Sequence, residues 1–418
     1  MDNKKICVLG LTHLGSVIMS CLSENFEIFA YDFNHEILKK FKNNNAVISE
    51  PGVKDLINQN KNQINYCDEH TNYENVDIFW LTADMPLDPD GTSNMVLFDE
   101  IIKEIITIIP NNKTLVISSQ VMLGTSRKIL NQFQKQGKMI KIAYSPENLR
   151  LGNAVSLFKN PDRIIIGCEE EDINLFKKFF CKLSDKLIFM SLEEAELTKH
   201  SINAFLALSI TYINEISLLC EEYGLNINNI SKGLKSENRI GDRLPLNAGL
   251  PFAGGTLQRD LNYLSVLSNS DYYEDILNLN KKHKKWIFEK INFIFKKFNI
   301  SNVLIVGCSY KEQTNVKEFS LIDEICQCLF NKKIKISVFD KKFKENPIQH
   351  FDINFINDYE IIEKKYDLYF LLNKDENIID MILNNKNKCY VLDPNHMIDR
   401  SLAGPNLNIF SVGRSYES

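Results

Sequence analysis

The sequence lacks the features that mark several large classes of protein. No run of 18 apolar residues occurs among its 418 residues, and the polar start, Met1 to Lys5, runs directly into an apolar strand pattern. A membrane span needs about 20 such residues and a signal segment needs an apolar stretch, so we expect neither a membrane protein nor a secreted one. Its 49 basic residues are scattered among 54 acidic ones, and the net charge is −5. Nucleic acid, which requires a concentrated basic face, is therefore not an expected partner.

Paired cysteine spacing is also missing. None of the ten cysteines stands in a C-x-x-C pair, and the closest two, Cys326 and Cys328, lie in an apolar helical pattern. Cysteines without a metal or disulfide spacing usually behave as small buried apolar residues. This pattern predicts reduced thiols, no metal site and a cytoplasmic location.

What is present is an ordinary globular composition in a long chain. Apolar residues make up 44% and charged residues 25%, which is the balance of proteins that fold around a hydrophobic core. A chain of this length exceeds what one core usually organises. The composition therefore predicts two or three domains, with enough chain for a cleft between them.

The first third of the chain alternates strand and helix patterns. An apolar run at 5–11 has Gly10 near its end, a helical pattern follows at 14–24, and a second run at 26–31 is closed by Asp32. Apolar runs followed by helical stretches continue at 76–81 and 114–118. Strand, glycine turn, helix, strand and acid form a βαβ unit. This order predicts a Rossmann-type, doubly wound parallel sheet.

The pattern then changes to helices and returns to strands. One amphipathic helix without glycine or proline is predicted at 192–223, and mostly helical sequence continues to about residue 298. The runs at 303–307 and 335–339 repeat the strand-helix-strand order. We therefore predict an α/β protein of three parts: a NAD-binding domain at 1–190, a helical dimerisation and substrate-loop domain at 191–298, and a second Rossmann-like domain at 299–418.

The glycine turn after the first strand is an incomplete dinucleotide-binding fingerprint. Gly10 and Gly15 stand at its first and last glycine positions, whereas Thr12 occupies the middle one. Asp32 follows the second strand, where an acid accepts hydrogen bonds from the adenosine ribose and repels a 2′-phosphate. The turn and the acid predict NAD as the cofactor in preference to NADP. We expect His13 to make a packing or polar contact near the pyrophosphate rather than to take part in catalysis.

Several short segments occur in an order that identifies a family. In chain order they are GLTHLG, YDFN, SEPGV, YSPENLRLG, a helix with Lys199 and Asn203, NEI, NRIG and FAGGTLQRD. Together they resemble the UDP-glucose/GDP-mannose dehydrogenase family over residues 5–395. The resemblance implies an N-terminal NAD domain, a central helix that pairs two subunits, and a C-terminal domain that helps to hold the nucleotide of a sugar substrate. It also implies a homodimer or a larger assembly.

Family members oxidise a primary alcohol of the sugar twice with two NAD, through an aldehyde that a cysteine captures, and hydrolyse the thioester to a uronate. The groups that the resemblance assigns to the first oxidation are kept as Lys199, Asn203 and Asp260. Lys199 and Asn203 are four residues apart on a helix and so share one face. The positions that match the family's cofactor contacts are Gly10, Thr12, His13, Leu14, Gly15, Asp32, Thr82, Ser119 and Gln120.

The groups that the resemblance assigns to the second oxidation are altered. Thr256 stands where the family has its cysteine, Leu151 replaces a glutamate, and Gln120 replaces the threonine of an STV segment. A threonine hydroxyl is a far poorer nucleophile than a thiol unless a base activates it. Glu147, the first carboxylate of the SPE segment, remains, and we count it and Thr256 among the catalytic positions.

Substrate contacts follow from the same resemblance. The expected residues are Leu149, Arg239, Phe252, Gly254, Gly255, Tyr310 and Lys311. Arg239 is expected to reach the substrate of the neighbouring subunit, since a guanidinium contacts phosphate or sugar oxygens in pairs. Lys317 stands where the family often has arginine, and Asn395 stands where it has the arginine of an Asp-Gly-Arg turn. That second replacement weakens any assignment of the nucleotide.

The sequence thus predicts an NAD-dependent oxidoreductase that takes one hydride from a UDP-sugar and yields an aldehyde or a keto-sugar. One alternative is a four-electron oxidation to a uronate, in which a hydrated aldehyde replaces the thiohemiacetal. Another is a catalytically silent protein that binds a nucleotide sugar or NAD. The sugar, the oxidised carbon and the pathway stay open.

Overall fold

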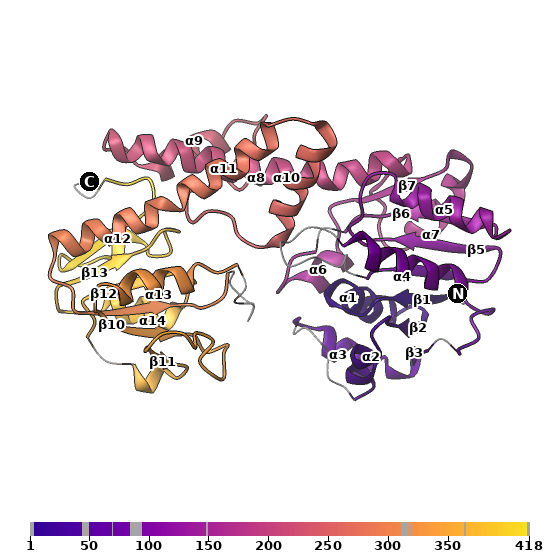
Figure 1. Ribbon diagram of the computed structural model, residues 1–418, viewed down its shortest axis with the longest axis horizontal. Helices are drawn as coiled ribbons and strands as arrows, with labels where there is room; N and C mark the ends of the chain where they lie inside the picture. The colour runs from indigo at the N-terminus through magenta and orange to yellow at the C-terminus, as the bar shows by residue number, and fades with distance from the viewer. Residues whose placement is uncertain are drawn as a thin grey trace. The chain divides into compact units, whose positions relative to one another are not determined.

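The computed structural model describes residues 4–43, 50–68, 70–83, 94–147, 149–310, 317, 319–362 and 365–415. The chain divides into two compact units, Met1–Ser201 and Ile202–Ser418. Each unit has its own sheet with helices on both faces (Figure 1).

The N-terminal unit is built on a sheet with the strand order β3-β2-β1-β4-β5-β6-β7-β8. Its strands are β1 (Lys5–Leu9), β2 (Glu27–Tyr31), β3 (Ile64–Tyr66), β4 (Ile78–Leu81), β5 (Lys113–Ile117), β6 (Ile140–Tyr144), β7 (Ile164–Cys168) and β8 (Leu187–Met190). The helices are α1 (His13–Leu22), α2 (His35–Lys42), α3 (Val53–Gln59), α4 (Met95–Ile108), α5 (Thr125–Lys135), α6 (Ala154–Lys159) and α7 (Ile173–Phe180). All neighbouring strands pair in parallel except β6 and β7, which are antiparallel.

The apolar runs that predicted these strands are buried on both sides. One core joins alternate residues of β1, β2 and β4 with α1, α3, α6 and α7. Trp80 on β4 lies at its centre, where its ring contacts Phe158, Phe179 and Phe180. Continuous apolar strands of this kind are typical of parallel sheets covered on both faces.

Helix α8 (Leu192–Glu222) confirms the long helix predicted from the sequence. The boundary between the two units falls inside it, after Ser201. One 18-residue window of α8 has a mean hydropathy of 1.4, and 44% of that window is buried within the fold. By length and composition alone, α8 is long and apolar enough to cross a bilayer. Core helices of globular proteins pass the same test, so this is a weak indication of a membrane span.

The C-terminal unit has a second parallel sheet with the order β11-β10-β9-β12-β13-β14. The strands are β9 (Asn302–Val306), β10 (Lys335–Phe339), β11 (Asn354–Ile356), β12 (Leu368–Leu371), β13 (Cys389–Leu392) and β14 (Leu407–Phe410). The helices that precede and cover it are α9 (Ile227–Lys235), α10 (Gly255–Ser268), α11 (Tyr272–His283), α12 (Lys285–Lys297), α13 (Ile322–Phe330) and α14 (Glu376–Leu383).

The helical middle of the chain and the second sheet share one core. Ile213 and Cys220 of α8 and Trp286 of α12 pack in the same cluster as Val303 and Ile305 of β9. A smaller cluster joins α8 to α10 and α11. The predicted fold class, two Rossmann-type α/β parts with a long central helix, is confirmed. The finer division into three parts at 190 and 298 stays a prediction, because the shared core joins the second and third parts into one unit.

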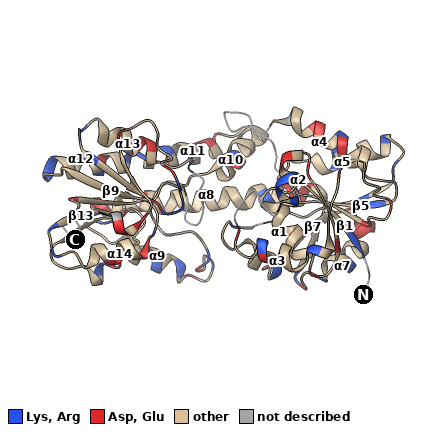
Figure 2. Ribbon diagram, turned by 90° about the horizontal axis from the view of Figure 1, so that it is seen from below, with Lys and Arg blue, Asp and Glu red and all other residues tan. Residues whose placement is uncertain are grey.

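The charged residues and the cysteines are spread over both units. Basic and acidic residues are interspersed along the ribbon of both units (Figure 2). All ten cysteines lie among the described residues and are free, and eight of them are buried. Among the described residues, no group of three or more His, Cys, Asp or Glu side chains is placed to hold a metal ion.

Candidate active site

The glycine turn between β1 and α1 has the backbone geometry of a dinucleotide site. Gly10 has a φ of +102°, and a Cβ atom there would lie 2.6 Å from the backbone of Ala83. A Cβ atom at Gly15 would lie 1.7 Å from the Gly10 carbonyl oxygen. The two glycines therefore let α1 pack closely on the sheet, which directs its N-terminus toward the ligand position.

The middle position of the fingerprint, which Thr12 occupies, does not require glycine. It precedes α1 with a φ of −69°, which any residue adopts. Its Oγ1 atom is buried without a hydrogen-bond partner among the described residues, and so is the hydroxyl of Ser119, which follows β5. Both residues lie beyond the carboxyl ends of strands, where ligands of this fold bind. Two orphaned hydroxyls at this edge fit a ligand rich in oxygen, such as the pyrophosphate and riboses of NAD.

Asp32 follows β2 and is 4% exposed. Its Oδ2 atom accepts the Leu11 N–H at 2.5 Å and its Oδ1 atom accepts the Asn34 N–H at 2.8 Å. The carboxylate thus fixes the glycine turn, and each of its oxygens belongs to a group that can accept more than one hydrogen bond. Its position fits the predicted preference for NAD, since a 2′-phosphate would meet a buried negative charge.

Thr82 lies beneath the turn. Its hydroxyl is fully buried and hydrogen-bonds the carbonyl oxygens of Gly10 at 2.7 Å and Leu9 at 3.2 Å. The structure therefore places this predicted cofactor residue as a support of the turn. His13 and Leu14 begin α1, and His13 Nε2 lies 2.9 Å from a carboxylate oxygen of Glu50, a contact that the sequence analysis did not predict.

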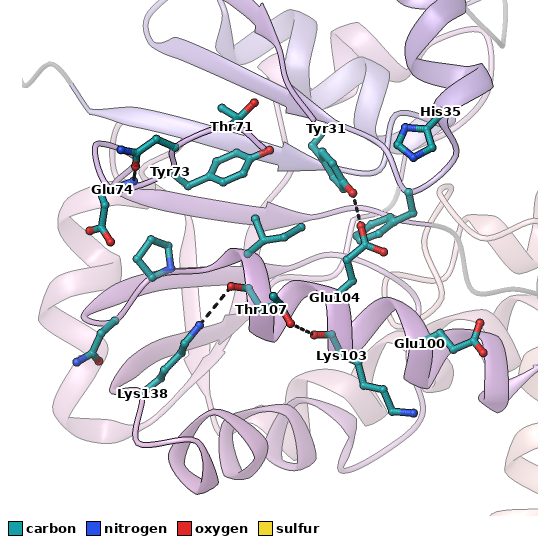
Figure 3. Close-up of a pocket in the computed structure, with 15 residues that line it drawn as sticks. Tyr31, His35, Thr71, Tyr73, Glu74, Glu100, Lys103, Glu104, Thr107 and Lys138 are labelled. Atoms are coloured by element: carbon teal, nitrogen blue, oxygen red, sulfur yellow. Dashed lines mark hydrogen bonds between the residues drawn. The ribbon is translucent and has the colours of Figure 1, made fainter. Parts of the chain in front are cut away.

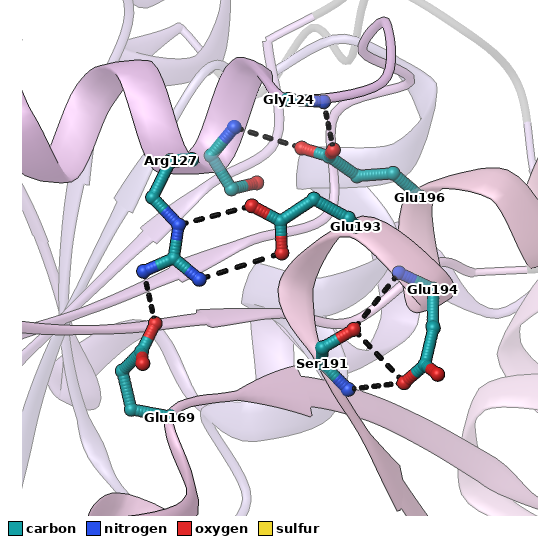
Figure 4. Close-up of polar contacts among 8 residues, drawn as sticks. Gly124, Arg127, Glu169, Ser191, Glu193, Glu194 and Glu196 are labelled. Carbon is teal, nitrogen blue, oxygen red and sulfur yellow. Dashed lines mark hydrogen bonds and ion pairs between the residues drawn. The ribbon is translucent and has the colours of Figure 1, made fainter.

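The segment that carries Gln120 is held by the first turns of α8 (Figure 4). Both oxygens of the buried Glu196 carboxylate accept backbone N–H groups, from Gly124 at 2.5 Å and Ser126 at 2.7 Å. One turn further on, His200 Nε2 donates to the Val121 carbonyl oxygen at 2.9 Å. These bonds hold the loop between β5 and α5 against α8.

A partly exposed cluster adds to the same contact (Figure 4). Arg127 on α5 donates to Glu193 on α8 at 2.9 Å and also pairs with Glu169. These hydrogen bonds raise the pKa of Arg127 above its usual value. The start of α8 is therefore fixed within the N-terminal unit.

Lys199 lies on the same part of α8 and contacts the SPE segment. Its Nζ atom donates to the Glu147 backbone carbonyl oxygen at 2.7 Å. Burial of the Glu147 carboxyl group raises its pKa to about 7, against the attraction of the Lys199 ammonium. A carboxyl group with this pKa can accept or release a proton near neutral pH. Leu149, predicted to contact the substrate, is half-buried and packs against the core of this unit.

In the C-terminal unit, the next residues of α8 face α10. Asn203 Nδ2 donates to Asp260 Oδ2 at 2.5 Å, and both side chains are buried. The structure therefore brings together two of the three groups assigned to the first oxidation, and fixes the orientation of the Asn203 amide. Lys199 and Asn203 share one continuous helix, as predicted.

The glycine-rich loop at 249–255 is held by side-chain amides. Asn214 Oδ1 accepts the Gly249 N–H at 3.0 Å, and Asn280 forms two hydrogen bonds of 2.9 Å with the backbone of Phe252. Asn395 Oδ1 accepts the Leu250 N–H at 2.8 Å. The residue at the family's arginine position therefore holds the loop through its own side chain, a role that no sequence pattern indicated.

Further predicted substrate residues lie around this loop or at the surface. Gly254 has a φ of +91°, and a Cβ atom there would lie 3.0 Å from the Tyr310 ring. The Arg239 side chain is 87% exposed. Among the described residues, it bonds only to Glu237 of its own turn. Lys317 pairs with Asp323 at 2.9 Å. Lys311 lies outside the described residues.

Thr256 is an exposed residue in the first turn of α10, one residue after Gly255. No hydrogen bond joins its hydroxyl to a base among the described residues, so the structure provides no group that would activate it as a nucleophile. Leu151 is half-buried, and its side chain cannot accept a proton.

One cavity of the N-terminal unit lies elsewhere. It has a volume of about 950 Å³, lies along α4 and is lined by Tyr31, Tyr73, Glu104 and Lys138 among others (Figure 3). The Tyr31 hydroxyl bonds to Glu104, and Lys138 donates to backbone carbonyls of α4, so much of its polar wall is already paired. None of the predicted site residues lines it, and we do not assign the reaction to it.

Comparison with known proteins agrees with this geometry. Residues 4–183 match the NAD-binding domain of the UDP-glucose/GDP-mannose dehydrogenase family, and residues 193–282 match its central domain. A UDP-glucose 6-dehydrogenase of Rickettsia bellii is 31% identical over 283 residues, which span 65% of each chain.

Two solved structures share the fold over nearly the whole chain. A UDP-glucose dehydrogenase from Pyrobaculum islandicum superimposes with a TM-score of 0.84 at 19% identity, covering 99% of this chain and 98% of that one. A UDP-D-ManNAc dehydrogenase from Pyrococcus horikoshii gives 0.81 at 17% identity, covering 99% and 100%. The predictions of family, NAD cofactor and enzyme class are confirmed, whereas the roles of individual site residues stay predictions. The chain belongs to the UDP-glucose/GDP-mannose dehydrogenase family, whose members are NAD-dependent dehydrogenases acting on the CH–OH group of nucleotide sugars.

Proposed function

We propose that this enzyme oxidises one hydroxyl group of a UDP-sugar in a single two-electron step and releases an aldehyde or a keto-sugar. The observation that carries the proposal is Thr256, an exposed residue whose hydroxyl has no activating base among the described residues and which stands where the resemblance places the family's cysteine. Leu151 and Gln120 replace two further groups of the aldehyde-to-acid stage. Each replacement alone is compatible with drift, but all three affect the same half of the reaction.

The first oxidation needs a group to receive the hydroxyl proton and a donor that stabilises the developing negative charge on oxygen. Asp260 is a buried carboxylate that Asn203 orients by a 2.5 Å hydrogen bond. Lys199 supplies a cation whose position is fixed by the Glu147 carbonyl oxygen. In our proposal Lys199 and Asp260 organise the proton, and the remaining N–H of the Asn203 amide contacts the sugar oxygen.

NAD, when bound, supplies the acceptor for the hydride. The residues that would hold it are those of the turn from Gly10 to Gly15, together with Asp32 and Ser119. Their geometry fits the group, because the turn has no room for side chains at its two glycines, and the buried hydroxyls of Thr12 in the turn and Ser119 after β5 have no hydrogen-bond partner among the described residues.

The second oxidation requires a covalent adduct that can lose a hydride and then leave as an acyl carrier. A threonine could form such an adduct only after losing its proton to a nearby base. Since Thr256 has no such base among the described residues, and Leu151 cannot assist hydrolysis of an acyl intermediate, we expect the second step to be slower by several orders of magnitude.

One observation favours the four-electron alternative as a second candidate. The pKa of Glu147, raised to about 7, would allow this carboxyl group to take a proton from water. A hydrated aldehyde formed in this way could lose a hydride without any thiol. The product would then be a uronate.

The proposal includes a cytoplasmic homodimer in which Arg239 reaches the partner's substrate. Phe205, Tyr212 and Leu219 of α8 follow one another at intervals of seven residues, and each side chain is about half exposed, at 53%, 49% and 50%. An apolar stripe with this spacing is typical of a helix that packs against another helix. Ten free cysteines support a reducing compartment. The UDP moiety is inferred from the relatives.

The test is the product mass after complete turnover with excess NAD, over a panel of UDP-, GDP- and CDP-sugars. Because alcohol oxidation by NAD is uphill near neutral pH, a carbonyl-trapping reagent is included, which condenses with the product carbonyl with loss of water. A product that has lost two hydrogens relative to the sugar, once the condensed trap is accounted for, with one NADH formed per sugar, supports the proposal. No NADH with any sugar supports the silent binding protein, and a uronate supports the second candidate. The variant T256C is the matched control: it should not form uronate, since Leu151 and Gln120 remain.

A further inference from the structure

A buried carboxylate outside the predicted site joins two of its segments. The Glu50 side chain is completely buried and precedes α3 in the N-terminal unit. A carboxylate is costly to bury unless hydrogen bonds compensate the loss of water. The groups that compensate it come from two different segments of the chain.

Three donors surround this carboxylate. Oε2 receives a hydrogen bond from His13 Nε2 at 2.9 Å and another from the Gly152 N–H at 2.9 Å. Oε1 receives the Ala154 N–H at 2.8 Å. Since an ionised carboxylate only accepts hydrogen bonds, the contact places the proton of the His13 ring on Nε2.

The two segments joined in this way belong to different parts of the reaction. His13 lies within the Gly10 to Gly15 turn, where the dinucleotide binds. Gly152 follows Leu151 in the segment that begins with Glu147, whose carbonyl oxygen holds Lys199. Gly152 has a φ of +88°, so its N–H direction depends on a backbone conformation that favours glycine. One carboxylate therefore contacts both the cofactor turn and the end of the Glu147 segment.

A second contact lies beside the hydrogen bonds of Glu50. Gly52, two residues after Glu50, has a φ of +85°, and a Cβ atom there would lie 3.7 Å from the Val155 side chain. Helix α1 also packs against both α3 and α6. The segment from Glu50 to Gly52 thus fills the space between the helix of the cofactor turn and the helix that follows the Glu147 segment.

We propose that Glu50 is a positioning residue: through His13 it fixes the cofactor turn, and through Gly152 and Ala154 it fixes the Glu147 segment to the same frame. A dinucleotide that binds at the turn then restrains the segment. The inference concerns the NAD-binding turn and does not depend on how many hydrides the enzyme removes.

The variants E50Q and H13F each remove part of the hydrogen bonding through which Glu50 joins His13 to Gly152 and Ala154. A glutamine at position 50 presents its NH₂ group either to the Ala154 N–H or to the His13 and Gly152 donors, and a phenylalanine at position 13 has no donor. The variant H13Q keeps an N–H donor at this position. E24Q is the matched control, because Glu24 pairs with Lys159 at the other end of α6, at 2.6 Å, and is partly exposed.

The readouts are the Kd of NADH, from its fluorescence, and the exchange rates of the Gly152 and Ala154 amide hydrogens with and without NADH. We expect E50Q and H13F each to weaken NADH binding by about fivefold to tenfold, the range of one lost hydrogen bond. The double variant should bind no worse than either single one, because both act on one link. NADH should slow amide exchange at residues 152 and 154 in the native protein and in H13Q, but not in H13F.

Three outcomes would overturn the proposal. They are unchanged NADH affinity in H13F, additive losses in the double variant, and protection of residues 152 and 154 by NADH that persists in H13F. H13F carries the test if E50Q does not fold, since the His13 side chain is 19% exposed and its loss leaves the carboxylate with two donors. E24Q should match the native protein in both readouts.

Discussion

Replacing Glu147 by glutamine should stabilise the protein at alkaline pH and leave it nearly unchanged in acid. Burial raises the pKa of this carboxyl group from 4.5 to about 7. As the pH rises above 4.5, the unfolded chain loses the proton first, so the folded state loses stability until the pH exceeds the folded pKa of about 7. Above that value the penalty stays constant.

The magnitude follows from the two pKa values. A rise of the pKa from 4.5 to about 7 corresponds to about 3 kcal/mol once both states are ionised. At pH 8 nearly all of this penalty applies, whereas at pH 5 it is about 1 kcal/mol. The neutral glutamine of E147Q avoids this penalty. The stability advantage of E147Q over the native protein should therefore grow by about 2 to 3 kcal/mol between pH 5 and pH 8.

The assay is calorimetric unfolding of both proteins at pH 5 and pH 8. For a unit of about 200 residues, 1 kcal/mol moves Tm by about 2 to 4 °C, so the Tm gap should widen by about 5 °C or more on going to pH 8. The control is E27Q, which removes a partly exposed pair with Lys5 of 3.0 Å. It should show no comparable change with pH, since exposed pairs contribute little. An E147Q protein that is less stable than the native one by the same amount at both pH values would refute the reasoning.

Three further predictions follow from the described contacts. NAD should bind more tightly than NADP, and D32A should relax this preference; equal affinities in the native protein would contradict the role of Asp32. In chemical unfolding, G15A should lose about 3 kcal/mol or more of the free energy of unfolding, because its Cβ would lie 1.7 Å from a carbonyl oxygen. G233A, which has open space around its Cβ position, should be neutral or slightly stabilising. Similar losses in both variants would argue against the close packing. Light scattering should report at least a dimer at micromolar concentration, and F205E with Y212E should shift it toward monomer; a native monomer would remove the proposed interface.

Much of the fold could be predicted from local patterns. The runs ending at Gly10 and Asp32 predicted the βαβ unit because strands buried on both faces are continuously apolar. The helix at 192–223 was predicted within one residue of its observed end at Glu222, since no glycine or proline interrupts it. The antiparallel pairing of β6 and β7 was not predicted, because strand direction depends on how the connection crosses the sheet and not on the strand residues themselves.

The site was predictable only where a residue type alone determines the chemistry. Glycines without room for Cβ and an acid after β2 indicated the cofactor turn. Glu50, Glu196 and Asn395 act on backbone groups far away in the sequence, and their residue types are equally common at protein surfaces. The raised pKa of Glu147 also depends on burial that only the folded chain creates.

The measurement that tests the central claim most directly is the mass of the product formed from a UDP-sugar with excess NAD and a carbonyl trap, together with the NADH yield. We predict one NADH per sugar consumed and a trap adduct whose carbonyl component has lost two hydrogens relative to the sugar. A product that has gained one oxygen and lost two hydrogens, with two NADH per sugar, would contradict the account.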